Sequence, residues 1–405
     1  MIGDSLWGLQ TALVAPMTVL AILMVKYGAS ETMIGSISAV ESGLIVLPQI
    51  LGNYVVVSTR SRKRRLIVWH FLTLIPFLFV MGLVAYLAET VSPALVRWAL
   101  LLAFAGHYFS MGAIVAVWMD WSAHLFSKEI RGRVLGITWG LYSGMGTFGA
   151  LLSGWLIESQ PASKIYALLY LSSGLLALMS MVVFALIRDP ASEVPDRMLR
   201  LRISELMVRF RESMRHANFR SYLLGRMLAA AGFSILPFLT VYFRSDSGGS
   251  LSEGFIVSSG AAMTLGWAVA SVILGRVGDR KGHRVGLLAA IGFQVISLLL
   301  VLFGGGPISC VLSYAAAGVS RGGMLISGMN LMFETCPHES RMAHIMVGNL
   351  TLSIVTISVP LLAGKAAGLW GVGTVFLISL LLSVCALLWT SVRMKEPRFL
   401  SAHKA

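Results

Sequence analysis

Charged residues are scarce in this chain. Only 12% of its 405 residues are Asp, Glu, Lys or Arg, whereas a typical globular domain has about 25%. Hydrophobic residues account for 57% of the sequence, and the mean hydropathy is +0.81. So few charges exclude a water-soluble fold of this size, and so much apolar sequence excludes extended disorder. The composition therefore predicts an integral membrane protein.

Cysteine and the common catalytic motifs are also rare or missing. The sequence has 3 cysteines, Cys310, Cys336 and Cys385, all in or next to apolar stretches and none in CxxC spacing. An odd number without that spacing argues against a disulfide framework and against a zinc site. The sequence contains no GxxxxGKS or GxxxxGKT and no HExxH motif, which are typical of ATP binding and catalytic zinc. A GxSxG match, GVSRG at 318–322, lies inside a long apolar run and not at the strand-to-helix turn that a serine nucleophile requires. We therefore expect no metal, no cofactor and no enzymatic activity.

Long apolar runs take up most of the sequence. Each has about 20 residues or more, enough for a helix to cross the hydrocarbon core of a bilayer. The runs do not alternate apolar with polar residues, which argues against a membrane β-barrel, so each spanning segment should be a helix. The first run is too long for a cleavable signal peptide, and we expect it to stay as a span. We predict an all-α polytopic membrane protein with twelve transmembrane helices at residues 3–25, 33–57, 66–88, 95–119, 134–157, 164–187, 221–243, 253–275, 285–304, 308–333, 342–366 and 371–392.

The formal net charge of +14 is distributed in a way that indicates a membrane rather than nucleic acid. Of the 32 Lys and Arg residues, 25 fall in the loops after even-numbered spans and in the C-terminal tail, and 5 fall on the opposite side. The positive-inside rule places the basic side and both termini in the cytoplasm. We expect a multi-pass protein of the cell (plasma or inner) membrane that contacts an anionic inner leaflet and binds no nucleic acid.

The longest connection between spans divides them into two sets of six. We predict an N-terminal half at 1–187, a cytoplasmic linker at 188–220, a C-terminal half at 221–392 and a cytoplasmic tail at 393–405. The second part of the linker places apolar residues at helical spacing among arginines. This pattern favours either a basic amphipathic helix on the inner leaflet or a solvated linker helix, and neither interpretation alters the function.

The two halves share short sequence similarities. LGNYVVVSTRSRKRR at the end of span 2 matches LGRVGDRKGHR at the end of span 8, with Gly52 aligned to Gly275 at an offset of 223 residues. KEIR at 128–131 resembles HESR at 338–341, at an offset of 210 residues. Two matches at nearly the same offset predict duplicated six-helix halves.

The loop after span 8 carries the most specific motif. GRVGDRKGHR at 275–284 resembles the G-x-x-x-D-R-x-G-x-R signature of the major facilitator superfamily of secondary transporters. The segment FSKEIRGRVLGITWGLYSGMGTFGALLSGWL at 126–156 resembles that family's connection between helices 4 and 5. This resemblance covers essentially the whole chain and implies two pseudo-symmetric six-helix bundles that rock about a midplane site. The first-half copy departs from the signature, because Val56 stands where the acidic residue should be.

The residue types in the second-half motif suit a conformational latch. Glycines allow a tight turn and close helix contact, and an aspartate in a cationic loop can pair with an arginine or lie at a helix start. The resemblance implies that this cluster holds the cytoplasmic side closed in the outward-facing state. The predicted latch residues are Gly275, Gly278, Asp279, Arg280, Gly282, Arg284 and Arg341.

Small residues and prolines predict contacts and breaks within the spans. Gly136, Gly140 and Gly144 recur every four residues in span 5 and predict a face for helix packing. Prolines remove a backbone donor and offer kinks or gate hinges. We expect Pro237 in span 7 to act as a hinge. The other prolines that interrupt predicted spans are Pro16, Pro48, Pro76 and Pro360.

Ionisable side chains inside a membrane are costly and are usually functional. Arg321 in span 10 and His107 in span 4 lie near the middle of helices that line the central cavity in the resembled fold. We predict that Arg321, His107 and Asn330 contact substrate, and that Glu41 or His107 couples proton movement. Structural roles are the alternatives, such as an arginine tied to a carbonyl, a packing histidine, or a glutamate nearer the outer interface. Arg226 in span 7 is expected to extend towards the cytoplasm.

These features predict a secondary active transporter that moves a small solute by alternating access. Arg321 favours an anionic or zwitterionic substrate. A non-transporting receptor or assembly protein on the same scaffold is an alternative that would also suit the degenerate first-half loop. A membrane-embedded lipid-processing enzyme is a weaker alternative, because the spans carry too few polar groups for its active site. We expect a monomer whose partners are a small-molecule substrate and the lipid bilayer.

Overall fold

The computed structural model describes residues 1–49, 62–125, 128–160, 162–187, 208, 210–335 and 341–397. Secondary structure in these ranges is helical throughout, as the apolar runs predict. The helices of the first six spans are α1 (Ile2–Leu13), η1 (Pro16–Leu20), α2 (Ala21–Lys26), α3 (Glu31–Val46), α5 (Arg62–Trp69), η2 (His70–Leu74), α6 (Ile75–Leu87), α7 (Pro93–His124), α8 (Lys128–Ser159) and α9 (Ser163–Leu186). Those of the last six are α11 (Ala217–Phe233), α12 (Leu236–Arg244), η3 (Asp246–Gly248), α13 (Glu253–Lys281), α14 (His283–Phe303), α15 (Gly306–Thr335), α16 (Arg341–Trp370) and α17 (Val372–Arg393).

Each of the twelve predicted spans contains a helical segment, which confirms the all-α polytopic fold, although residues 50–57 of the second span lie outside the described residues. Within the described ranges, 9 helical segments are long and apolar enough to cross a membrane. The other three predicted spans correspond to α3, α8 and α15. The chain is therefore a multi-pass membrane protein.

Local sequence explains where several helices begin. Ser30 and Ser92 precede α3 and α7, and each side chain accepts a hydrogen bond from the backbone N–H three residues later. This is the usual way to satisfy a free donor at a helix start. Gly282 and Gly371 have φ of +93° and +82°, so the chain turns sharply between α13 and α14 and between α16 and α17.

The chain divides into two compact units. The first comprises Met1–Met198 and Ser250–Ala261, and the second comprises Leu199–Gly249 and Ala262–Ala405. The start of α13 thus belongs with the first unit, where the Tyr166 hydroxyl donates a hydrogen bond of 2.7 Å to Glu253.

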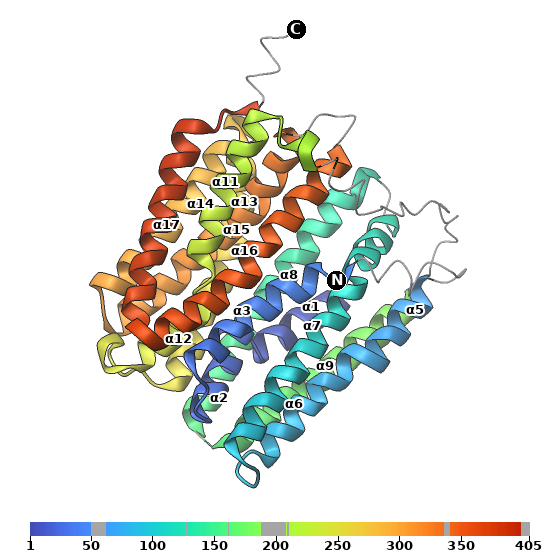
Figure 1. The fold of residues 1–405 in the computed structure, drawn as a ribbon. Helices are drawn as coiled ribbons and strands as arrows, with labels where there is room; N and C mark the ends of the chain where they lie inside the picture. The colour runs from blue at the N-terminus through green and yellow to red at the C-terminus, as the bar shows by residue number, and fades with distance from the viewer. Residues whose placement is uncertain are drawn as a thin grey trace. The chain divides into compact units, whose positions relative to one another are not determined.

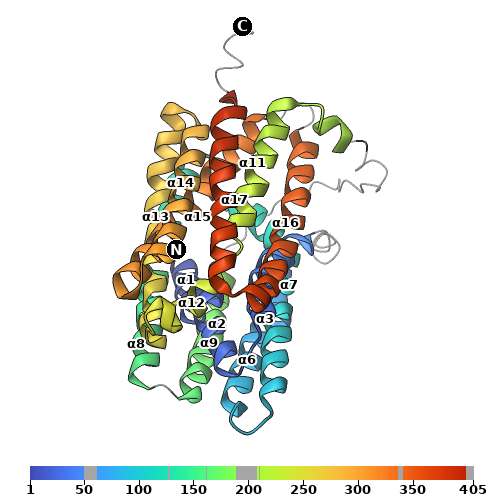
Figure 2. The ribbon, with the colours of Figure 1, turned by 60° about the vertical axis from the view of Figure 1, so that its left-hand side comes forward.

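Helices pair in the same way within each unit. In the first unit α1 packs on α8 and α9, and α6 packs on α7 and α9. In the second, α11 packs on α16 and α17, and α14 packs on α15 and α17 (Figures 1 and 2). Counted by span, spans 1, 3, 4, 5 and 6 repeat as spans 7, 9, 10, 11 and 12 with the same four pairings. This agrees with two pseudo-symmetric six-helix bundles.

Prolines break two corresponding spans. Span 1 leaves the α-helical pattern after Leu13 and continues as the π-helix η1, which begins at Pro16. Span 7 breaks after Phe233 and resumes as α12, with Pro237 in its first turn. Pro360 is different, because α16 continues through it and is not interrupted.

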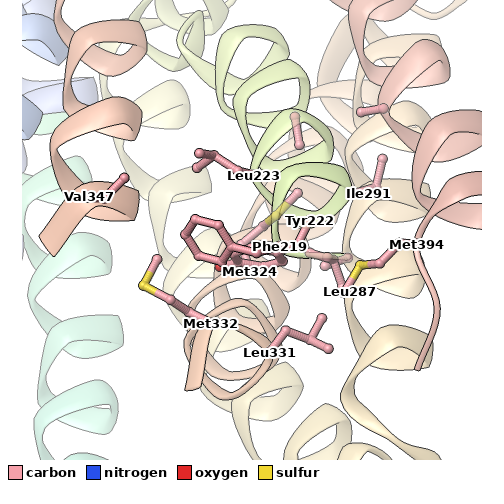
Figure 3. Packing of buried hydrophobic residues seen from close by; sticks show 13 residues of the cluster. Phe219, Tyr222, Leu223, Leu287, Ile291, Met324, Leu331, Met332, Val347 and Met394 are labelled. Atoms are coloured by element: carbon pink, nitrogen blue, oxygen red, sulfur yellow. The ribbon is translucent and has the colours of Figure 1, made fainter. Parts of the chain in front are cut away.

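The core of the second unit lies where α11 meets α15. Phe219, Tyr222 and Leu223 of α11 pack against Met324, Leu331 and Met332 of α15 (Figure 3). Phe219 and Leu331 are fully buried. The Tyr222 hydroxyl donates a hydrogen bond of 2.7 Å to the carbonyl of Gly328, which fixes the two helices together at this level.

Candidate functional site

Arg321 lies at the centre of α15, fifteen residues after its start and fourteen before its end. Its side chain is exposed, as are those of Leu325 and Met329 along the same helix. Asn330 is nine residues further on, which places it on the opposite side of the helix at 3.6 residues per turn. Its amide donates a hydrogen bond of 2.9 Å to the carbonyl of Ile326 in its own helix. Arg321 and Asn330 therefore do not share one face of α15.

Arg226 is turned towards α15. Its Nη1 lies 2.7 Å from Sδ of Met324, and its Cζ lies 3.0 Å from the position that a Cβ at Gly328 would occupy. These contacts attach the side chain to α15, and the expectation that it extends towards the cytoplasm stays a prediction. The absent side chain at position 328 leaves the space that the guanidinium fills. Sequence reasoning singled out Arg226 but missed its contact with α15, because no local pattern reveals which neighbouring helix offers such a gap.

His107 is buried in the first unit. Its Nδ1 lies 3.1 Å from the carbonyl oxygen of Leu74, the last residue of the π-helix η2. Its ring packs edge-on against the ring of Tyr108, with centroids 5.6 Å apart. These contacts suit the structural alternative, and its role in substrate binding or proton coupling stays a prediction.

A second buried histidine, His70, was not singled out from the sequence. Its Nδ1 lies 2.7 Å from the carbonyl oxygen of Leu66. The rings of Trp7 and Trp118 approach it edge-on, with centroids 5.5 and 5.3 Å away. His70 begins the π-helix η2, and such segments often accompany functional sites. The signal in the sequence was Pro76, which disturbs the hydrogen bonding of the preceding turn.

Glu41 lies in α3, with its side chain half-buried and its Oε2 buried. α3 packs on α7, where the backbone of Gly112 comes close to the carbonyl of Leu44. Glu41 thus lies in the described helix of the second predicted span, and its part in proton coupling stays a prediction.

The signature loop contacts the segment that follows α17. Gly282 sits between α13 and α14, and a Cβ at this position would clash with the carboxylate of Glu396. Oε2 of Glu396 accepts a hydrogen bond of 2.9 Å from the backbone N–H of Arg284, at the start of α14. The Arg284 guanidinium donates to the carbonyls of Thr390 and Ser391 at the end of α17. Arg284 therefore binds the end of α17, whereas the sequence suggested it as a partner for Asp279.

The other described latch side chains lie in the last two turns of α13. The side chain of Asp279 is 75% exposed, and its carboxylate lies 3.7 Å from Nε2 of His283. Gly278 lies close to the His283 ring, and Gly275 faces Ile326 across ordinary van der Waals distance. Arg280 is exposed. The side chain of Arg341 lies outside the described residues, so the latch as a whole stays a prediction.

The packing face predicted for span 5 has no close partner among the described residues and stays a prediction. Gly136, Gly140 and Gly144 are exposed, and within the described part of the chain no neighbouring helix comes within 4 Å of a Cβ built on them. Close contacts of α8 come from Gly149, which meets Leu9 of α1, and from the backbone of Tyr142, which meets Gly8 of α1. Gly154 of α8 also lies close to Gly254 and Ser258 of α13. Glycine spacing indicated that a helix could approach α8 but not which face of α8 it meets.

A small cavity borders the break in span 7. It has a volume of about 10 Å³ and is lined by Phe233, Ile235, Leu239, Gln294 and Ser297 among others. This is room for about one water molecule and is too small for a solute.

Comparison with known proteins now identifies the family. An all-α membrane protein with repeated six-helix units is the class that the fold defines. The sequence model of the Major Facilitator Superfamily matches residues 5–267 and 222–405. The chain belongs to this superfamily of secondary transporters.

Individual relatives are more distant. The multidrug resistance protein MdtG of Dickeya zeae (strain Ech586) is 23% identical over 258 residues, which are 63% of this chain and 62% of that protein. The chain thus matches less than two thirds of that relative. A mutant form of the nucleoside transporter NupG superposes with a TM-score of 0.72 at 15% identity, covering 97% of this chain and 99% of that one. A D-xylose-proton symporter gives a TM-score of 0.67 at 16% identity, covering 98% and 97%. At these identities the structures show the fold alone.

Proposed function

We propose that this member of the superfamily is a secondary active transporter that moves a small solute across the cell membrane by alternating access. The supporting observation is the pair of breaks in spans 1 and 7, at Pro16 and Pro237. Helices interrupted at corresponding positions of two repeats mark the binding region of many transporters, because broken turns free backbone groups to meet a substrate.

Reconstitution of the purified chain into proteoliposomes tests this proposal. We expect saturable uptake of a radiolabelled solute, and counterflow when the vesicles are preloaded with the same unlabelled solute. Empty liposomes control for leakage. Specific ligand binding without counterflow would support the receptor alternative and contradict transport.

Proton coupling is examined in the same vesicles. An inwardly directed proton gradient should accelerate uptake, and Glu41→Gln or His107→Gln should remove the acceleration while leaving counterflow intact, because exchange needs no net proton movement. Gradient-driven uptake that survives both substitutions would rule out these two residues as the coupling groups.

Export of apolar compounds is a second candidate. The relative MdtG is named a multidrug resistance protein, and the likeness motivates a direct test. Cells that express the chain would then accumulate less of a fluorescent dye than cells that do not express it. Equal accumulation would leave solute uptake as the better proposal.

We also propose that both termini are cytoplasmic, from the excess of basic residues in the even-numbered loops. A protease-sensitive tag after Ala405 should be cleaved only after the cells are permeabilised. Cleavage in intact cells would reverse the orientation.

A further inference from the structure

Gln294 connects three helices of the second unit beside the break in span 7. It lies in α14, is 1% exposed, and its side-chain amide donates hydrogen bonds to the carbonyl of Ala229 in α11, at 3.0 Å, and to Oγ of Ser383 in α17, at 2.7 Å. The Ser383 hydroxyl in turn donates to the carbonyl of Ser379, one turn earlier in α17, at 2.7 Å. Because a carbonyl oxygen only accepts, the nitrogen of the amide must face Ala229. Both N–H groups of the amide and the hydroxyl of Ser383 are therefore used.

This pair packs directly on the last turn of α11. Gly232 is the residue before the end of α11, and a Cβ at this position would clash with Oγ of Ser383 and with Nε2 of Gln294. A glycine is thus required for the pair to approach the backbone so closely. α11 ends at Phe233, and span 7 resumes as α12 at Leu236. The pair therefore holds the turn immediately before the break.

The first unit has a similar pair at the break in span 1. The hydroxyl of Ser173 in α9 lies 2.8 Å from Oε1 of Gln10 and 3.1 Å from the carbonyl oxygen of the same residue, and it donates to these acceptors. Gln10 is 2% exposed, and Ser173 is fully buried. Gln10 is one of the last four residues of α1, whose carbonyls have no donor within the helix. Ser173 thus supplies a donor to the last turn before this break.

The two serines occupy corresponding places in the two halves. Ser173 and Ser383 are 210 residues apart, which is also the offset between KEIR and HESR, and each lies in the last span of its unit. The glutamines differ in origin, because Gln10 belongs to the broken span itself and Gln294 to span 9. A buried amide and a buried serine therefore meet the turn before the break in both units, by different routes. Buried polar groups are costly unless they are bonded, so their recurrence at both breaks indicates a role that concerns the breaks.

The break in span 7 also has adjacent space and an unused acceptor. Oε1 of Gln294 is buried and has no hydrogen-bond partner in the described part of the chain. Gln294 lines the cavity of about 10 Å³ together with Ile235 and Leu236, which lie at the break. Oε1 can accept a backbone N–H of this turn if the turn moves into the cavity, while Nε2 stays bonded to Ala229. The amide can thus remain bonded while the break changes its bend.

We propose that these two pairs, Gln294 with Ser383 and Gln10 with Ser173, set the bend of spans 7 and 1 and so control the movement of the broken spans during transport. The four side chains are positioning residues, because they act on the backbone of a broken span and not on the solute. The assignment rests on the proposed function, in which the two breaks mark the binding region.

Spin labels on both sides of the break measure its bend without a ligand. Arg220→Cys in α11 and Ser247→Cys after α12 introduce exposed labelling sites into the purified full chain, whose three native cysteines are replaced by alanine. Double electron–electron resonance then gives the distribution of distances between the labels. For Gln294→Leu we expect a broader distribution whose mean shifts by about 2 Å or more, because a change of roughly 20° in the bend moves the ends of two helical arms of this length by that amount.

Ser297→Ala is the matched control in the same helix. Ser297 lies about one turn after Gln294, is also buried, and its hydroxyl donates to the carbonyl of Ser313 in α15, at 2.9 Å. Both substitutions remove a buried polar contact of α14, but only Gln294→Leu should alter the distances. Ser383→Ala should shift the mean in the same direction by less, because Gln294 keeps its bond to Ala229. This variant takes the place of Gln294→Leu if the latter does not fold.

Two serines of α9 give the same comparison in the first unit. Ser173→Ala removes the donor to Gln10, whereas Ser180→Ala removes a buried hydroxyl that donates to the carbonyl of Gly3, at the start of α1, at 2.8 Å. The measurement uses proteoliposomes and the radiolabelled solute that gives counterflow with the native chain. We expect Ser173→Ala to lower the rate of counterflow severalfold at an unchanged half-saturating concentration, and Ser180→Ala to leave both quantities unchanged.

The inference is wrong if Gln294→Leu and Ser383→Ala leave the label distances unchanged, or if Ser297→Ala shifts them equally. It is also wrong for the first unit if Ser173→Ala gives counterflow at the native rate. The outcome for transport is separate. If the labels shift as expected but no solute undergoes counterflow with the native chain, the pairs set the bend and the proposed transport is wrong. If the native chain transports a solute and Gln294→Leu transports it equally fast, transport stands and its control by the pair is wrong.

Discussion

Glu396 and Arg284 are joined by a hydrogen bond from the backbone N–H of Arg284 to Oε2 of Glu396, at 2.9 Å. Arg284 is the second residue of α14, where backbone N–H groups have no partner within the helix. Glu396 follows the last helix, α17. The end of the described chain therefore supplies a hydrogen-bond acceptor to the first turn of α14, where the signature loop ends. The Arg284 side chain in turn donates hydrogen bonds to carbonyls at the end of α17, so the two segments bind each other in both directions.

Glu396→Ala should destabilise the second unit. The substitution leaves a backbone donor at the start of α14 without its acceptor, which typically costs about 1 kcal/mol. The midpoint of thermal unfolding should fall by roughly 2 to 4 °C. Glu396→Gln retains an acceptor oxygen and should lose less. A midpoint for the alanine variant equal to the native one would show that the contact contributes nothing.

Gly282→Ala should destabilise the protein more strongly. Its φ of +93° is unfavourable for any residue with a Cβ, and the new methyl group would clash with Glu396. A cost of about 1 to 3 kcal/mol is expected from backbone strain alone. Gly136→Ala is the matched control, because this helical glycine meets no neighbour within 4 Å of an added Cβ among the described residues. The control should be neutral or slightly stabilising, and an equal loss in both variants would contradict the explanation.

Gly8→Ala should weaken the contact between α1 and α8. A Cβ at this position would clash with the backbone carbonyl of Tyr142. The helices would have to separate, and overpacking of this kind typically costs about 1 to 3 kcal/mol. Gly140→Ala, on the exposed face of α8, serves as the comparison in a thermal unfolding measurement. Comparable midpoints for the two variants would mean that α1 and α8 are less tightly packed than the structure shows.

Pro237→Ala should slow transport with little effect on ligand affinity. The substitution restores a backbone donor at the break between α11 and α12 and favours a continuous helix. We expect a severalfold lower rate of counterflow at an unchanged half-saturating concentration. Pro360→Ala provides the control, because α16 already continues through that proline. Equal rates in Pro237→Ala and the native chain would remove the hinge prediction.

The sequence predicted the helices well for a simple reason. Hydrophobic runs of spanning length can satisfy their backbone only as helices, so composition alone determines the type of element. The break at Pro237 was also predictable, because proline lacks the donor that the preceding turn requires. The duplication was visible in the alignment of Gly52 with Gly275, and the repeated helix pairings agree with it.

The site was less predictable, because it depends on partners from distant helices. The direction of the Arg226 side chain depends on the gap at Gly328, 102 positions away. The spacing of Gly136, Gly140 and Gly144 indicated a small-residue face but could not reveal that α1 meets the face of α8 that carries Gly149. Glu396 looked like part of a simple tail, and only the folded chain brings it to Gly282.

The contact between Glu396 and α14 has a practical consequence for work with this protein. A chain shortened to end at Arg393 would lose both the acceptor for the Arg284 amide and the backbone pair that Asn218 forms with Lys395. Such a truncation would loosen two helix starts at once, at α11 and at α14, although it removes no membrane span. Purification handles should therefore be appended after the final residue and never substituted for the last dozen.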